Sequence, residues 1–106
     1  KRRTREQAFT VAPQVLVDNN ASDTHTVLEV NARDRVGLLY DLTRALVRLN
    51  LSVSSAHIAT YGERAVDVFY VKDMFGLKVT SEAKIRAIET EMLAAIAEKP
   101  KPKKAA

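Results

Sequence analysis

At Asn31-Ala32-Arg33-Asp34-Arg35-Val36-Gly37-Leu38-Leu39, the hydrophobic pattern of the chain changes its period. Residues 24–31 alternate between apolar and polar, which is the pattern of a β-strand. The apolar positions that follow recur at helical spacing, at Leu39, Leu42, Leu46 and Leu49. We therefore expect a strand that ends near Asn31 and a helix over 35–49, capped by Asp34, with these leucines in the core.

Gly37 would lie in the first turn of this helix, where a glycine is unexpected. Glycine costs about 1 kcal/mol relative to alanine inside a helix. The first turn of a helix also leaves backbone N–H groups unpaired, and these groups bind anions. The pattern indicates a ligand site. The alternative is purely structural: Asp34 only caps the helix, and Gly37 only relieves crowding against the sheet.

The remaining pattern predicts two hairpins and a second helix. A strand over 14–17 follows Pro13, and the turn-forming cluster 18–23 joins it to the strand over 24–31. Strands over 51–61 and 64–72 flank Gly62-Glu63, a pair suited to a type II′ turn. Thr80 or Ser81 should cap a last helix with a buried stripe at Ile85, Ile88, Met92 and Ile96. The order is β-β-α-β-β-α.

The second hairpin has two apolar faces if Tyr61 lies opposite Arg64. One face then carries Ala56, Ile58, Thr60, Ala65, Asp67, Phe69 and Val71. The other carries Val53, Ser55, His57, Ala59, Val66, Val68 and Tyr70. We expect helices to cover one face and a partner to cover part of the other.

The charge distribution argues against nucleic-acid binding. The chain has a net charge of +4, but residues 7–97 hold 9 basic and 11 acidic residues, a net charge of −2. The basic residues lie in an N-terminal segment, 1–8, and in a lysine- and proline-rich tail, 98–106, which we expect to be disordered. Phe69 and Tyr70 are adjacent and cannot share a base-stacking face. One folded domain, 9–97, remains.

Other function classes lack their chemistry. The absence of cysteine excludes a disulfide framework and a thiolate zinc site, and it fits a cytoplasmic location. No apolar run is long enough to span a membrane. His25 and His57 have no clustered carboxylates, so we expect no metal site and read His57 as a packed strand residue. Asp67, inside an apolar strand, could hydrogen-bond Thr60 or a backbone amide in a structural role, and the alternative is contact with a ligand.

A phosphatase-like enzyme is the remaining catalytic alternative. Arg33 and Arg35 could hold a phosphate group, but no nucleophile or water-orienting group accompanies them. We therefore expect no catalytic residue in this chain. Because the chain begins with Lys1, we also expect it to be a piece of a longer protein.

Two motifs, over 33–42 and 56–71, resemble the ACT domain family of small regulatory modules in amino-acid metabolism. The resemblance covers 9–96 and is stronger to the C-terminal ACT domains of bacterial uridylyltransferase/uridylyl-removing enzymes, which modify the nitrogen signal protein PII. It implies an α+β, ferredoxin-like two-layer sandwich: a four-stranded antiparallel sheet with two helices on one face. The leading strand would replace the last strand of the β-α-β-β-α-β order. Val36 stands where the family often has proline.

The resemblance also implies a function and an effector site. Such domains pair side by side and bind amino acids at the interface, here L-glutamine, which would shift the parent enzyme from adding UMP to PII towards removing it. The chain itself would hold no cofactor, and the parent would use Mg²⁺ for catalysis. The alternative is an interaction or dimerisation module that binds no small molecule.

The motif assigns specific residues to the site. These are Asp34, Val36, Gly37, Leu38 and Leu39, completed by Asn50, Leu51 and Ser52 from the same or a neighbouring subunit. Asp34 would receive the effector's ammonium group, and the amides near Gly37 and Leu38 would receive its carboxylate.

Overall fold

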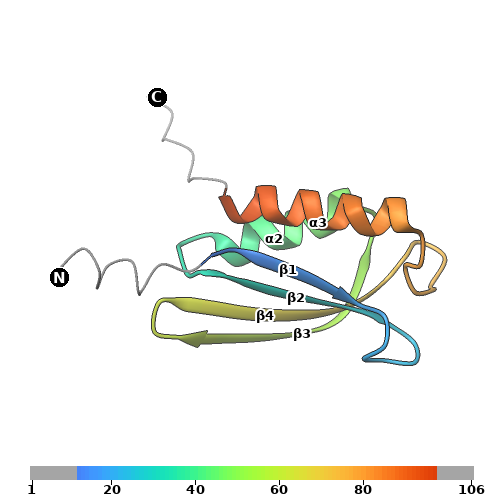
Figure 1. Cartoon of the computed structure of the whole chain (residues 1–106), viewed down its shortest axis with the longest axis horizontal. Helices are drawn as coiled ribbons and strands as arrows, with labels where there is room; N and C mark the ends of the chain where they lie inside the picture. The colour runs from blue at the N-terminus through green and yellow to red at the C-terminus, as the bar shows by residue number, and fades with distance from the viewer. Residues whose placement is uncertain (1–11, 98–106) are drawn as a thin grey trace.

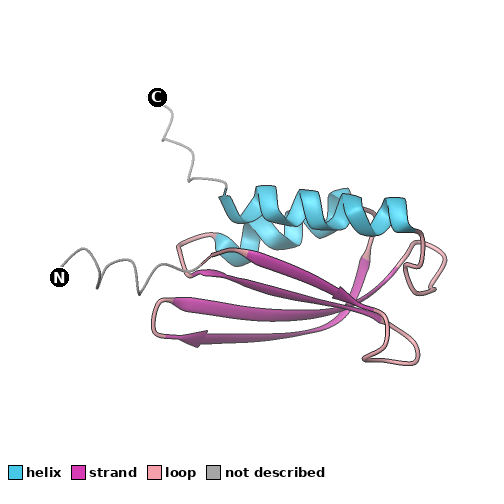
Figure 2. Cartoon of the chain, viewed as in Figure 1, coloured by secondary structure: helices cyan, strands magenta, loops and turns pink. Residues whose placement is uncertain are grey.

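The computed structural model describes residues 12–97, which form a four-stranded sheet with two helices on one face (Figures 1 and 2). The elements are β1 (Gln14–Asp18), β2 (Thr26–Arg33), α2 (Leu38–Arg48), β3 (Ser52–Tyr61), β4 (Arg64–Lys72) and α3 (Glu82–Ala97). The sheet order is β1-β2-β4-β3, and all neighbours are antiparallel. The predicted ferredoxin-like sandwich is confirmed. Within residues 12–97, no helix is long and apolar enough to cross a membrane.

The leading strand takes the edge position predicted for it. β1 pairs with β2, with Gln14 opposite Asn31 and Asp18 opposite Val27. Pro13 directly precedes β1, a position that proline tolerates because an edge strand has no second neighbour to receive its missing N–H. The strand therefore completes the sheet from the N-terminal side.

The core lies between the sheet and the two helices. Its largest fully buried side chains are Phe69, Leu28, Leu42, Leu46, Ile88 and Met92. Leu39 was expected among them, but it is 43% exposed, whereas Leu38 is only 3% exposed. Because the buried stripe of α2 runs through Leu38, Leu42 and Ala45, Leu39 is turned about 100° away from the centre of that stripe.

The second hairpin has the predicted turn and, with one exception, the predicted register. Tyr61 lies opposite Arg64, and Gly62 has the positive φ (63°) that the turn requires. The exception is an irregularity between Val53 and Ser55 that places Val53 opposite Val71. Val53 therefore leaves the face to which simple alternation assigned it, because the extra residue shifts the alternation by one.

β3 is exposed along almost its whole length, which the sequence did not predict. Only Ala59 is partly buried, while Ile58 and Val53 on the helix side are 49% and 43% exposed. The helices lie over the other strands instead, as Figure 1 shows. The expectation that helices cover the whole of one hairpin face is wrong for β3, because two helices pack over β1, β2 and β4 and leave this edge uncovered.

Candidate functional site

Residues 34–37 form the loop from β2 to α2, here called the Asp34 loop. The Asp34 N–H donates to the Glu63 carbonyl at 2.8 Å, so the loop lies beside the β3–β4 turn. The residue before the helix is Gly37, with φ 84° and no side-chain cap. The predictions that Asp34 caps the helix and that Gly37 lies in its first turn are wrong. A left-handed residue stops the helix from extending back to Asp34.

The first turn of α2 presents backbone donors at the surface. The Leu38 N–H donates to the Arg35 carbonyl at 3.2 Å, and the Asp41 N–H to the Gly37 carbonyl at 2.9 Å. Within residues 12–97, the N–H groups of Gly37, Leu39 and Tyr40 donate to no backbone carbonyl. Such donors, at the positive end of a helix, suit a carboxylate or phosphate group.

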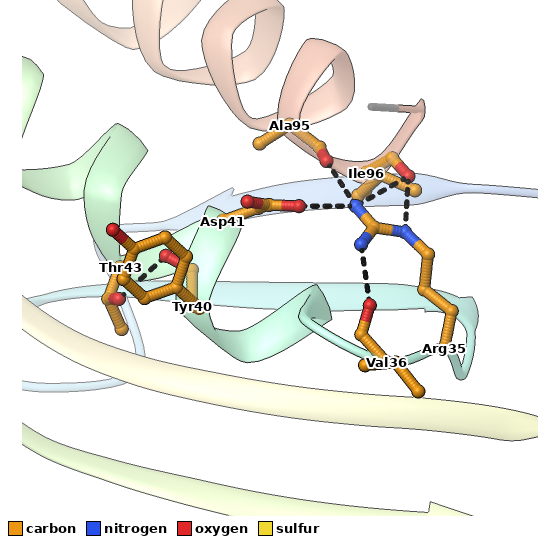
Figure 3. Close-up of polar contacts among 7 residues, drawn as sticks. All are labelled: Arg35, Val36, Tyr40, Asp41, Thr43, Ala95 and Ile96. Carbon is orange, nitrogen blue, oxygen red and sulfur yellow. Dashed lines mark hydrogen bonds and ion pairs between the residues drawn. The ribbon is translucent and has the colours of Figure 1, made fainter. Parts of the chain in front are cut away.

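Arg35 fixes the Asp34 loop against both helices (Figure 3). Its Nη2 lies 2.9 Å from Asp41 Oδ2 and donates to the Ala95 carbonyl at 2.8 Å, while its Nη1 donates to the Val36 carbonyl at 3.1 Å. Arg35 thus neutralises the C-terminal end of α3. Arg33 is also paired, 3.0 Å from Glu63. Neither arginine is placed to hold a phosphate group.

Replacing Arg35 by methionine should lower the free energy of unfolding by about 2–3 kcal/mol, because it removes charged hydrogen bonds and leaves Asp41 half-buried without its partner. Arg33→Met is the matched control. The Arg33–Glu63 pair is 60% and 58% exposed, so its loss should cost about 1 kcal/mol or less. Urea denaturation measures both. Equal losses of unfolding free energy in the two variants would show that the Arg35 contacts stabilise the fold no more than the exposed Arg33–Glu63 pair does.

The other predicted site residues lie at the far end of α2. Asn50 follows the helix, is exposed and has φ 60°, while Leu51 is 7% exposed and Ser52 begins β3. α2 has 11 residues, so it separates this group from the Asp34 loop by about 16 Å. One chain does not bring the two groups together.

A cavity of about 250 Å³ lies at this far end. It is lined by Asn50, Asp73, Met74, Phe75, Lys78, Val79, Thr80, Ser81 and Lys84. Lys84 Nζ donates to the Leu49 carbonyl at 2.6 Å, and Ser81 accepts the backbone N–H of Lys84 at 3.3 Å, as predicted for a capping residue. Of the predicted site residues, the cavity lining includes Asn50 alone.

Asp67 is a buried acid with an unsatisfied oxygen. It is 2% exposed, and its Oδ1 has no hydrogen-bond partner. Burial raises the pKa of its carboxyl, a backbone hydrogen bond from Ala59 opposes that shift, and the charge of Asp34 adds to it. Within residues 12–97, no hydrogen bond joins Asp67 to Thr60. The signal in the sequence was an acidic residue at a core-facing position.

The two histidines lie on the sheet face away from the helices. Both histidine rings meet the Tyr70 ring edge-on: the centroid of His25 lies 6.3 Å and that of His57 5.7 Å from the Tyr70 centroid. His25 Nε2 also lies 2.8 Å from Ser54 Oγ. His57 is a residue of β3, as predicted, and it is exposed while its ring packs against Tyr70. Among residues 12–97, no three metal-ligating side chains cluster.

Comparison with known proteins gives one family and many relatives. The profile described as "ACR family N-terminal ACT domain" matches residues 21–99. The bifunctional uridylyltransferase/uridylyl-removing enzyme of Azospirillum brasilense is 64% identical over 95 residues, 90% of this chain and 10% of that protein. The one from Ruegeria pomeroyi is 56% identical over 98 residues, 92% of this chain and 11% of that protein. The chain therefore spans about a tenth of these relatives.

A solved structure supports the fold alone. The crystal structure of an unknown protein from Galdieria sulphuraria superposes with a TM-score of 0.54 at 24% identity. The match covers 67% of this chain and 37% of that chain.

Proposed function

The chain belongs to the ACT domain family, and from that premise we propose that it is a glutamine sensor of a PII-modifying enzyme. The effector would bind at the Asp34 loop. It would shift a parent uridylyltransferase/uridylyl-removing enzyme from adding UMP to PII towards removing it. The observation that carries the proposal is the Asp34 loop, which carries an exposed carboxylate and leads into a helical turn with unpaired amides.

The edge of the sheet supports side-by-side pairing with another ACT domain. β3 has ten residues, Ser52–Tyr61, and contains no proline and no acidic residue, lysine or arginine. Natural proteins usually protect a long edge strand with such residues, because an unprotected edge pairs with another chain. The uncovered strip formed by Val53 and Ile58 of β3, which are 43% and 49% exposed, would be buried by the same contact.

Pairing through β3 would also complete the site. If two copies pair antiparallel through this edge, the start of one β3 meets the end of the other. The end of β3 leads into the turn at Glu63, whose carbonyl binds the Asp34 N–H. Asn50, Leu51 and Ser52 of one copy then approach the Asp34 loop of its partner. The two groups that one chain keeps apart would thus form one site.

The chemistry of the assembled site matches glutamine. The amides of Gly37, Leu39 and Tyr40 suit the carboxylate, and Asp34 suits the ammonium group. The Asn50 side chain and the Ser52 hydroxyl each donate and accept hydrogen bonds, as a carboxamide does. This arrangement favours glutamine over glutamate, whose second carboxylate only accepts.

The regulatory effect belongs to the longer enzyme that we propose as parent. The relatives from Azospirillum brasilense and Ruegeria pomeroyi support it, since both are named bifunctional uridylyltransferase/uridylyl-removing enzymes. Glutamine would act through different affinities for two states of that enzyme, a coupling of about 1–3 kcal/mol. PII, the Mg²⁺ of catalysis and a cytoplasmic location all belong to this proposed parent, and the ACT domain would contribute no catalytic group.

Isothermal titration of L-glutamine into this chain tests the proposal, with L-glutamate as control and sedimentation equilibrium recording the association state. We expect saturable glutamine binding by the paired form and weaker glutamate binding. A well-paired protein that binds neither would support the alternative, an interaction module without a small ligand.

A further inference from the structure

The unsatisfied carboxyl of Asp67 lies between the core and the uncovered strip of β3. Asp67 pairs with Val30 in β2 and with Ile58 in β3. Directly paired residues of antiparallel strands point to the same face, so all three side chains face the helices. Val30 is 1% exposed under the helices, whereas Ile58 is 49% exposed. Asp67 is therefore buried, but its neighbour on β3 opens to solvent.

Packing alone gives no reason for an acid at this position. The other core-facing residues of β4 are Ala65, Phe69 and Val71, and each is at most 4% exposed. An acid with an unsatisfied oxygen costs stability in such a place, since burial removes its water without supplying a full set of partners. Buried polar groups without partners are rare in native proteins, and they often mark functional sites.

A second acid acts on Asp67, and the loop that carries this acid leads to a set of backbone donors. Asp34 is exposed, and its negative charge contributes to raising the pKa of the Asp67 carboxyl. The Asp34 loop leads into the first turn of α2, where the unpaired amides of Leu39 and Tyr40 lie. The two acids could bind a positively charged group, and the unpaired amides could bind a negatively charged one. An α-amino acid carries these two groups one carbon apart.

We propose that Asp67 is the residue that selects for the α-ammonium group of the effector, with its Oδ1 accepting a hydrogen bond from that group while Asp34 contacts it from the surface. This inference rests on the proposed function, because it concerns the same site. It adds a determinant outside both segments assigned from the sequence. It also names the chemical feature that Asp67 reads, the amino group rather than the carboxamide.

The test compares two ligands that differ only at the α-carbon: L-glutamine, and glutaramic acid, which has hydrogen in place of the amino group. Titration calorimetry on the full chain measures both. Wild type should bind glutamine at least tenfold more tightly than glutaramic acid. The Asp67→Asn variant keeps the side-chain shape. It should lower the affinity for glutamine at least tenfold and leave the affinity for glutaramic acid within about twofold of wild type.

Controls separate this role from a structural one. Asp23→Asn removes an exposed acid in the β1–β2 turn and should leave both affinities unchanged. Because burial raises the pKa of Asp67, its ionised form costs the folded state stability at neutral pH. Asp67→Asn should therefore be at least as stable as wild type. Should it unfold instead, the ¹³C carboxyl resonance of wild-type Asp67 replaces it: glutamine must move this resonance, and glutaramic acid must not.

Each remaining outcome contradicts a different claim. If wild type binds neither ligand, the proposed function fails, and this inference fails with it. If wild type binds glutamine and Asp67→Asn binds it equally well, only the inference about Asp67 is overturned. An equal loss of affinity for both ligands in Asp67→Asn also overturns the inference about Asp67, because that pattern shows a general structural effect rather than selection for the amino group.

Discussion

A lysine in place of Ala56 should leave the domain folded but weaken its self-association at least tenfold, and glutamine binding should fall with it. Ala56 is an exposed residue of β3, opposite Phe69 of β4. A lysine on an edge strand blocks pairing with another chain. Because the Asp34 loop and Asn50–Ser52 would meet only across the two chains of the proposed pair, a monomer would hold half of the site.

Leu16→Lys is the matched control for the edge. Leu16 lies on β1, the opposite edge strand, and is 45% exposed. The Leu16→Lys variant should leave both self-association and glutamine binding unchanged. Sedimentation equilibrium gives the association constants, and calorimetry gives the affinities. A monomeric Ala56→Lys that binds glutamine as tightly as wild type would refute an effector site shared between two copies.

Gly37→Val should reduce glutamine affinity more than tenfold while the core stays folded. Gly37 has φ 84°, and an added Cβ would lie 3.7 Å from Arg35 Nη1, an ordinary contact. The cost therefore comes from the backbone: a residue with a side chain pays about 1–2 kcal/mol in this conformation. The loop must relieve that strain by changing shape, which moves the amides that would bind the carboxylate.

Gly76→Val provides the same backbone strain at another place. Gly76 has φ 79°, and nothing lies within 4 Å of an added Cβ. It belongs to the loop from β4 to α3, at the other end of the molecule from the Asp34 loop (Figure 1). The two variants should lose similar stability on denaturation, but Gly76→Val should keep wild-type glutamine affinity. Equal losses of affinity would mean that strain, rather than the Asp34 loop, controls binding.

The fold was largely predictable because most elements depend on local patterns. The alternation over 24–31 and the Gly62-Glu63 turn determined strand identity and hairpin register without long-range information. The predicted start of α2 was wrong, because the left-handed conformation of Gly37 depends on how the loop returns over the sheet. The shift at Val53 was missed for a related reason: an extra residue within one strand has no distinctive signal in the Ser-Val-Ser-Ser stretch over 52–55.

The candidate site was predictable only where its residues are contiguous. Asp34 to Leu39 form one motif, and the structure keeps them in one loop and the first helical turn. The placement of Asn50 to Ser52 at the opposite end of α2 follows from helix length, which the motif does not express. The unsatisfied oxygen of Asp67 was hidden, since the sequence shows an acid in an apolar strand but not which of its atoms find partners.

An amide chemical-shift titration of the full chain with L-glutamine would locate the effector site residue by residue. We expect saturable shifts concentrated at Gly37, Leu38, Leu39 and Tyr40, with a second group at Asn50 to Ser52 in the paired protein. Glutaramic acid should shift the same amides only at much higher concentration. Saturable shifts confined to the distant cavity around Thr80 and Lys84, or no shifts in a well-paired protein, would contradict a glutamine site at the Asp34 loop.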